Sequence, residues 1–199
     1  MSLNPAQNAA VEHCDSPLLV LAGAGSGKTR VITQKIYHLI QNRKIPASKI
    51  AAITFTNKAA KEMRERANSL LRNVDSEGLT ICTFHSLGLK ILQIEHEAVG
   101  LRRGFSIFDV DDGNALIKEL LPRGTNGQAI SAVRGLISKV KSEGLSPERA
   151  AELASSPRER EAADIYAQYQ RRLAAFNAVD FDDLIRIPVQ LLETNETVR

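Results

Sequence analysis

The sequence predicts an α/β fold: a parallel sheet with crossover helices, followed by a mostly α-helical part. In the first half of the 199 residues, short apolar runs alternate with amphipathic segments of helix length. After Gly100 the pattern is almost entirely helical, with Gly and Pro between the helices. The hydrophobic fraction of 43% is that of a globular chain, and no apolar run reaches the ~18 residues of a membrane span.

The first half begins with a helix start, because Asn4 suits an N-cap and Pro5 suits the first helical position. Apolar runs and helical periodicity then predict the remaining elements. We expect strands over 18–22, 50–56 and 79–84, and helices over 6–14, 27–42, 57–71 and 85–99. Strands that are separated by helices of this length pair in parallel.

The second half predicts five further helices. Their expected ranges are about 111–121, 128–142, 147–154, 158–176 and 180–192. Two segments in this half, "FSIFDVDD" and "AVDFDDLI", bring aspartates after apolar residues. Each resembles a strand that ends in an acid, but each is more typical of a helix start with acidic residues in its cap and first turn.

A glycine-rich segment, "AGAGSGKT", joins the first apolar run to the second helix. It fits the P-loop pattern with Ala in place of the first Gly, in the strand-to-helix context that the pattern requires. Its glycines allow a tight turn whose N–H groups face phosphates, Lys28 would reach the β- and γ-phosphates, and the Thr29 hydroxyl would hold Mg²⁺. The expected ATP-binding residues are Ala22, Gly23, Ala24, Gly25, Ser26, Gly27, Lys28, Thr29 and Arg30. The alternative is a loop that only joins a strand to a helix.

Thr-Phe pairs end the second and third predicted strands, in "TFTNKAAKEMRER" and "TFHSLGL". Ligands gather at the carboxyl ends of strands in an open α/β sheet, where an exposed Phe can stack a base and polar groups can bind backbone phosphate. The candidate DNA contacts are Phe55, Thr56, Asn57, Thr83, Phe84 and His85. Alternatively, Phe55 lies in the core, the nearby charges form a solvated face, and His85 is a cap or a buried structural residue.

Charge and cysteine content add weaker indications. The net charge is +3, with the basic excess in the first half, which suits a polyanion but also an ordinary solvated surface. Cys14 and Cys82 lie far apart without metal-ligand spacing, as expected for free thiols in a reducing cytoplasm. The N-terminus lacks the build of a signal peptide, so a cytoplasmic location is expected.

Taken in order, these segments resemble the UvrD/Rep-type superfamily 1 DNA helicases along the whole chain. "LNPAQNAAV" is similar to the family's Q motif, "AGAGSGKT" to its Walker A motif, and the two Thr-Phe segments to its single-strand-binding motifs. "DFDDL", which starts at Asp180, is similar to a further short motif. The resemblance implies that Gln7 reads the adenine edge.

The resemblance also implies the architecture and the process. Residues 1–90 would form part of a RecA-like ATP-binding domain, 91–195 an inserted helical DNA-binding subdomain, and 196–199 the return to the first domain. The parent protein would be an ATP-driven motor that moves 3′ to 5′ on single-stranded DNA and opens forks in replication restart or repair. Within the family, a repair helicase or the motor of a recombination nuclease stays open.

In the family, an acidic motif on a strand follows the "DFDDL" helix, and the arginines that sense the γ-phosphate come later. We therefore expect this chain to be an N-terminal piece without Walker B acids or arginine finger, which binds ATP without turning it over. Its incomplete sheet would expose an edge and favour self-association. Two other classes remain: a small nucleotide kinase, for which no Arg-rich lid is evident, and a non-catalytic P-loop binding module.

Overall fold

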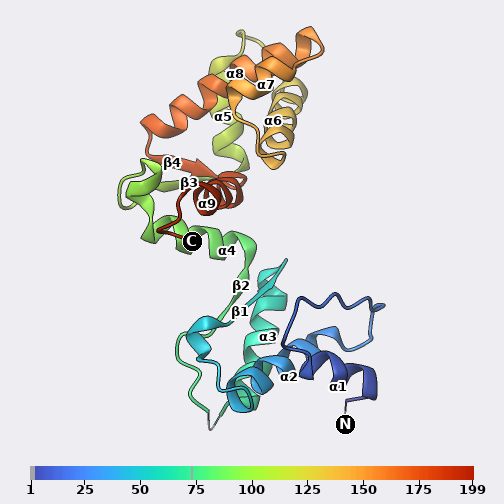
Figure 1. Cartoon of the computed structure of the whole chain (residues 1–199). Helices are drawn as coiled ribbons and strands as arrows, with labels where there is room; N and C mark the ends of the chain where they lie inside the picture. Colours follow the sequence, from blue (N-terminus) through green and yellow to red (C-terminus); the bar gives the residue numbers. More distant parts are fainter. Residues whose placement is uncertain (1–2, 73) are drawn as a thin grey trace. The chain divides into compact units, whose positions relative to one another are not determined.

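The structure is a computed structural model that describes residues 3–72 and 74–199 (Figure 1). It divides into a first unit that ends at Phe84 and a second unit from His85 to Arg199. The sequence suggested a division at residue 90, and the structure groups residues 196–199 with the second unit. No helix in the described ranges is long and apolar enough to cross a bilayer.

The first unit is built around a short parallel sheet. Its elements are α1 (Pro5–Glu12), α2 (Lys28–Gln41), a 3₁₀ turn η1 (Ala47–Lys49), β1 (Ala51–Thr54), α3 (Asn57–Leu70) and β2 (Thr80–Thr83). β1 pairs in parallel with β2, so that Ala51 lies opposite Thr80 and Thr54 opposite Thr83. The crossover through α3 confirms the parallel pairing that the alternating pattern predicts.

The core of the first unit lies between these strands and the helices α2 and α3. It consists of Ile36, Ile40, Ala47, Ile50, Ala52, Met63, Ala67, Leu71 and Ile81. The Arg64 guanidinium adds a polar tie, because its Nη2 donates to the carbonyl of Ile81 at 2.7 Å. This contact holds α3 against β2. Arg64 is one of the charged residues that the sequence placed on a solvated or DNA-facing surface, and it has a structural partner instead.

The strand predicted over 18–22 is absent from the described first unit. The segment between α1 and α2 is drawn as a plain coil in Figure 1, and Leu19 and Leu21 are 82% and 87% exposed. A strand is stabilised by hydrogen bonds to a neighbour, and β1 and β2 pair only with each other in the described sheet. The prediction from apolar content was therefore wrong, because apolar content supplies no pairing partner.

The second unit is mostly helical, as predicted. Its elements are α4 (Phe84–Ile94, whose first residue closes the first unit), η2 (His96–Val99), β3 (Ser106–Phe108), α5 (Val110–Leu120), α6 (Gly127–Ser142), α7 (Pro147–Leu153), α8 (Pro157–Ala175), β4 (Ala178–Asp180) and α9 (Asp183–Thr194). The strands β3 and β4 pair in parallel, with Phe108 opposite Asp180. Sequence analysis missed both strands, since three residues are too few to show a period of two.

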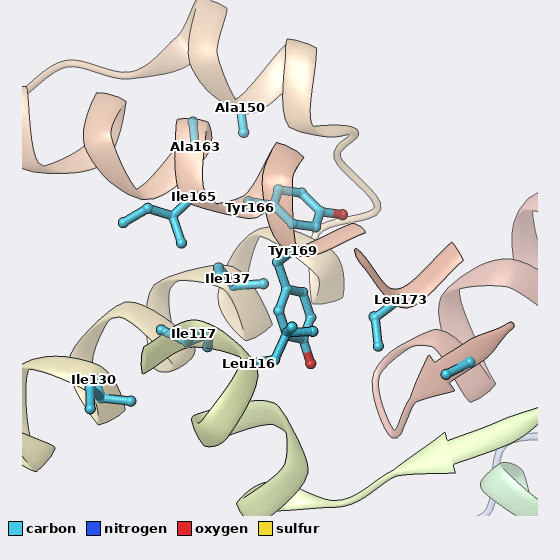
Figure 2. Packing of buried hydrophobic residues seen from close by; sticks show 11 residues of the cluster. Leu116, Ile117, Ile130, Ile137, Ala150, Ala163, Ile165, Tyr166, Tyr169 and Leu173 are labelled. Atoms are coloured by element: carbon cyan, nitrogen blue, oxygen red, sulfur yellow. The ribbon is translucent and has the colours of Figure 1, made fainter. Parts of the chain in front are cut away.

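The core of the second unit is centred on α8. Tyr166 and Tyr169 of α8 belong to one cluster with Ile137 of α6 and Leu116 of α5, and Figure 2 shows the Tyr169 ring beside Leu116. A smaller cluster of Leu92, Val179 and Leu184 joins α4, β4 and α9. The two clusters together fix β4 and the start of α9 against the helices.

Two aspartate-bearing segments begin helices in different ways. Asp109 is the N-cap of α5 and accepts the backbone N–H groups of Asp111 and Asp112, which confirms the capping prediction. By contrast, Asp180 closes β4, and α9 starts at Asp183, three residues after the predicted start at 180. The acidic residues of the second segment are used for ion pairs, which are described below.

Candidate functional site

The glycine-rich loop before α2 forms a tight turn that is closed on the Gly23 carbonyl. This oxygen accepts the backbone N–H of Ser26 at 3.4 Å and its hydroxyl at 2.7 Å. Gly25 and Gly27 adopt φ values of 74° and 82°, which side chains rarely tolerate. Gly27 is the N-cap of α2 and no side chain of the described residues caps that end, so its first N–H groups face an open anion position.

Lys28 folds across this loop. Its ammonium donates to the carbonyls of Ala22 at 3.1 Å and Gly23 at 2.6 Å. Phosphate oxygens are charged acceptors and bind an ammonium more strongly than neutral carbonyls do, so a nucleotide would compete for this group. Thr29 follows in the first turn of α2, where its hydroxyl suits Mg²⁺. Ala24 and Arg30 flank the same turn, and the donor set of the whole segment fits a nucleotide phosphate with its Mg²⁺.

Gln7 connects the first helix to this loop. Its Oε1 accepts the N–H of Asn4 at 2.9 Å, while Asn4 accepts the N–H of Gln7 at 2.8 Å, which forms a capping box. The Gln7 amide also donates to the Ser26 carbonyl at 3.1 Å. A Cβ at Gly27 would lie 3.2 Å from the Gln7 Nε2, so a glycine at this position gives the amide room.

A cavity of about 360 Å³ opens beside Gln7. Its walls come from α1, the segment before the loop and α2, and its lining includes Ala10, Val20, Val31 and Ile32 with Lys28 at one side. Mostly apolar walls with the amides of Asn4 and Gln7 and the ammonium of Lys28 have the chemistry of a pocket for a flat base and its phosphates. The structure therefore brings Gln7 and the phosphate loop (residues 22–29) together.

An aromatic pair lies at the carboxyl ends of β1 and β2. The ring centroids of Phe55 and Phe84 are 5.7 Å apart and the rings are tilted by 48°. Phe55 is 87% exposed, which excludes the alternative that it lies in the core. We call Phe55 and Phe84 the first aromatic pair.

The polar candidates around this pair have different surroundings. Thr56 is the N-cap of α3 and its hydroxyl oxygen accepts the N–H of Ala59 at 3.1 Å, while Asn57 is the first residue of that helix. Thr83 is only 6% exposed at the end of β2. The expectation of a direct contact with a strand is therefore weakened for Thr83, whose side chain lies below the surface.

A second aromatic pair consists of His85 in α4 and Phe181 in the turn between β4 and α9. Their ring centroids are 5.9 Å apart, and Phe181 is exposed. Sequence reasoning treated "DFDDL" only as a motif and missed Phe181. The available signal was an aromatic residue inside an otherwise acidic turn.

Four charged residues pair with one another around the turn that contains Phe181. We call Lys141, Asp180, Asp183 and Arg186 the Lys141 cluster. The Lys141 ammonium lies 2.6 Å from Oδ2 of Asp180 and 2.9 Å from Oδ2 of Asp183. Arg186 donates from Nε and Nη2 to Oδ1 of Asp183 at 3.1 and 2.9 Å. Lys141 is 1% exposed. Sequence analysis missed this cluster because Lys141 stands in a lysine-bearing helix end that resembles a solvated surface.

The cluster shifts the pKa values of its two aspartates in opposite directions. Burial and the nearby Asp183 carboxylate raise the pKa of Asp180, against the effect of Lys141. Burial also disfavours ionised Asp183, but Lys141 and Arg186 outweigh it and hold the pKa of Asp183 below its ordinary value. Burial raises the pKa of Tyr166 to about 12, so this neighbour stays neutral. Of the two aspartates, Asp183 is therefore the one whose ionised form the cluster favours more.

Comparison with known proteins agrees with these features. The family described as "UvrD/REP helicase N-terminal domain" matches residues 3–199. The chain is 48% identical to ATP-dependent DNA helicase Rep of Escherichia coli (strain K12) over 201 residues, which cover 100% of the chain and 30% of that relative. It is 40% identical to ATP-dependent DNA helicase PcrA of Bacillus subtilis (strain 168) over 194 residues, 96% of the chain and 26% of PcrA.

A third relative, ATP-dependent DNA helicase UvrD1 of Mycobacterium leprae (strain TN), is 43% identical over 198 residues, 96% of the chain and 25% of its own length. The chain thus spans about a quarter to a third of the relatives that it matches. These matches confirm the resemblance that the ordered motifs indicate. The chain belongs to the UvrD/REP helicase N-terminal domain family.

Proposed function

We propose that this chain is the ATP-binding and single-stranded-DNA-binding part of an ATP-dependent DNA helicase. The observation that carries the proposal is the exposed Phe55, which stands with Phe84 at the ends of two parallel strands in the unit that holds the phosphate loop. Exposed aromatic rings are costly in water and suit the stacking of bases. The relatives carry the name of ATP-dependent DNA helicases.

The proposed nucleotide site is the phosphate loop with Gln7. The N–H groups at the start of α2 and the Lys28 ammonium bind the phosphates, and Gln7 faces the base from the side of α1. When bound, Mg²⁺ neutralises phosphate charge, and Thr29 is the residue of the loop that would hold it. On binding, Lys28 exchanges two carbonyl acceptors for phosphate oxygens.

The proposed DNA contacts are the two aromatic pairs. Phe55, Phe84 and Phe181 present exposed rings on which bases stack, and His85 accompanies Phe181. Thr56 and Asn57 stand at the start of α3, where hydroxyl, amide and backbone N–H groups suit DNA phosphates. Thr83 is only 6% exposed and is not proposed as a direct contact.

For the whole protein we propose a motor that moves 3′ to 5′ along single-stranded DNA, opens forks in the cytoplasm, and acts in replication restart or repair. Hydrolysis requires acids near the Mg²⁺ and cations near the γ-phosphate. The aspartates that came nearest to such a motif have other partners: Asp109 caps α5, while Asp180 and Asp183 bind Lys141. We therefore propose that this chain binds ATP and DNA without turnover.

Titration of four variants with ATP–Mg²⁺ and with fluorescent oligo-dT tests the proposal. Lys28→Ala should lose most nucleotide affinity and keep DNA affinity, whereas Phe55→Ala should weaken oligo-dT binding by about 1–3 kcal/mol and keep nucleotide affinity. Lys118→Ala and Phe176→Ala, which change an exposed lysine and an exposed phenylalanine of the second unit, are the matched controls. The proposal would be overturned if the variants and their controls lost nucleotide or oligo-dT affinity equally. Rapid ATP hydrolysis by the pure chain would also overturn it.

A further inference from the structure

We propose that Lys141 of α6 is a positioning residue for the second aromatic pair, His85 and Phe181. The proposal rests on the proposed function, because it assigns the pair a place in the DNA site. Lys141 would touch no DNA. It would act by holding the turn between β4 and α9, from which Phe181 projects.

The turn that carries Phe181 is closed from both of its ends. Asp180 stands directly before Phe181, and Asp183 stands two residues after it. Oδ1 of Asp180 accepts the backbone N–H of Asp183 at 3.0 Å, while Oδ2 of each aspartate binds the Lys141 ammonium. One ammonium therefore bridges the last residue of β4 and the first residue of α9, and the intervening backbone has little freedom.

The ammonium is itself fixed by the core of the second unit. It lies 5.8 Å from the ring centroid of Tyr166 and 5.2 Å from that of Tyr169, both on α8, and these rings point into the core in Figure 2. Its side chain leaves α6 in the last turn, beside the buried Ile137. The turn is thus positioned by α8 and by α6, whose Lys141 lies 39 residues before Asp180 in the chain.

The other member of the pair, His85, is positioned by a contact between α4 and α9. His85 lies one turn before Gly88 on α4, and a Cβ at Gly88 would come 1.7 Å from the carbonyl oxygen of Leu184. The helix α4 therefore rests directly on the backbone of α9. This contact places His85 against the start of α9, while Phe181 follows the last residue of β4. The distance between the two rings therefore depends on how β4 is joined to the start of α9, and Lys141 binds an aspartate on each side of that turn.

Stability alone is a poor explanation of the Lys141 cluster. Well-packed apolar residues often replace buried ion pairs without loss of stability, because removing charges from water is costly. What the charges add is geometry: one ammonium at hydrogen-bond distance from two carboxylates ties both ends of the turn to the same point. An exposed ring needs such a fixed backbone if it is to stack on a base at a defined position.

The test compares Lys141→Met with Lys139→Met, an exposed lysine of the same helix, in the full 199-residue chain. A second variant, Lys141→Met with Asp180→Asn and Asp183→Asn, also removes the two carboxylates that Lys141 binds, in case the single change prevents folding; the side-chain oxygen of the new asparagine at position 183 can still accept from Arg186. Two quantities are measured on each folded protein: the nuclear Overhauser contact between the rings of His85 and Phe181, and the affinity for oligo-dT.

We expect the ring contact to be lost in the Lys141 variants and kept in Lys139→Met. Oligo-dT affinity should fall roughly tenfold, as for Phe181→Ala, and adding Phe181→Ala to a Lys141 variant should cause no further loss. A folded Lys141 variant that keeps the ring contact would overturn the proposal. So would a combined variant in which the losses of oligo-dT affinity from the Lys141 change and from Phe181→Ala add. If the unaltered chain does not bind oligo-dT, the proposed function fails, while the ring contact still decides whether Lys141 positions Phe181.

Discussion

Gly88 of α4 faces the carbonyl oxygen of Leu184 in α9 so closely that a Cβ on Gly88 would lie 1.7 Å from that oxygen. The nearest neighbour is backbone, which cannot rotate away as a flexible side chain can. The contact brings His85 to the same end of α9 as Phe181. A residue without a side chain is thus a structural requirement of the second aromatic pair.

Gly88→Ala should destabilise the second unit by about 1–3 kcal/mol or more, because α4 and α9 must move apart. Gly135→Ala is the matched control, since it lies exposed in α6 with open space around its Cα. It should stabilise by about 1 kcal/mol through helix propensity. Urea unfolding followed by circular dichroism measures both changes. Equal changes in the free energy of unfolding at the two glycines would contradict the close contact between Gly88 and Leu184.

Asp183→Asn should lower the free energy of unfolding by about 3 kcal/mol at pH 7, because it removes one partner from a buried ion pair. The pKa of Asp183 is depressed below its ordinary value of 3.8, so its contribution is present above that value and is lost as the pH falls through the lower folded value. The difference between Asp183→Asn and the unaltered chain should therefore shrink below about pH 4.

The exposed Asp164 on α8 offers the control, because Asp164→Asn should change stability little at any pH. Unfolding curves at pH 7, 5 and 3 compare the proteins. A destabilisation by Asp183→Asn that stays constant across this range would rule out the assigned role of the carboxylate charge.

The exposed segment 18–21 should drive self-association of the chain. Leu19 and Leu21 are almost fully exposed, and contiguous apolar surface of this kind is typical of a contact site. Leu19→Lys with Leu21→Lys should shift the protein toward the monomer in sedimentation at rising concentration, whereas Ile94→Lys, at a single exposed residue, should not. A strictly monomeric unaltered chain at high concentration would refute this prediction.

Gln7→Ala should weaken ATP binding more than Asn4→Ala does. Each change removes one half of the capping box and should cost α1 about 0.5–2 kcal/mol. Only Gln7 also donates to the Ser26 carbonyl of the phosphate loop. Calorimetric titration with ATP–Mg²⁺ separates the two effects, and equal losses of affinity would mean that Gln7 acts through the helix alone.

The residues of the candidate nucleotide site could be named from the sequence because their chemistry is local. The glycines, Lys28 and Thr29 are neighbours in the chain, and Asn4 and Gln7 form their capping box within one turn. The position of Phe55 and Phe84 at neighbouring strand ends could also be predicted, since parallel strands bring their carboxyl ends to one edge of the sheet.

Other features depend on pairing between distant segments. The apolar run 18–22 has the composition of a strand but no neighbour in the described sheet, and the short β3 and β4 exist only because they pair across some seventy residues. Periodicity reports which face of a segment is apolar. It carries no information on whether a partner is present.

The sequence by itself determined the order of helices, the parallel pairing of β1 with β2, and the ordered motifs that identify the family. Only the tertiary structure decided that Lys141 is buried between Asp180 and Asp183, and that Phe181 stands beside His85. The physical reason is that a charge has no preferred partner in a sequence. Its partner is chosen when α6, β4 and α9 pack together and exclude the water that would otherwise solvate it.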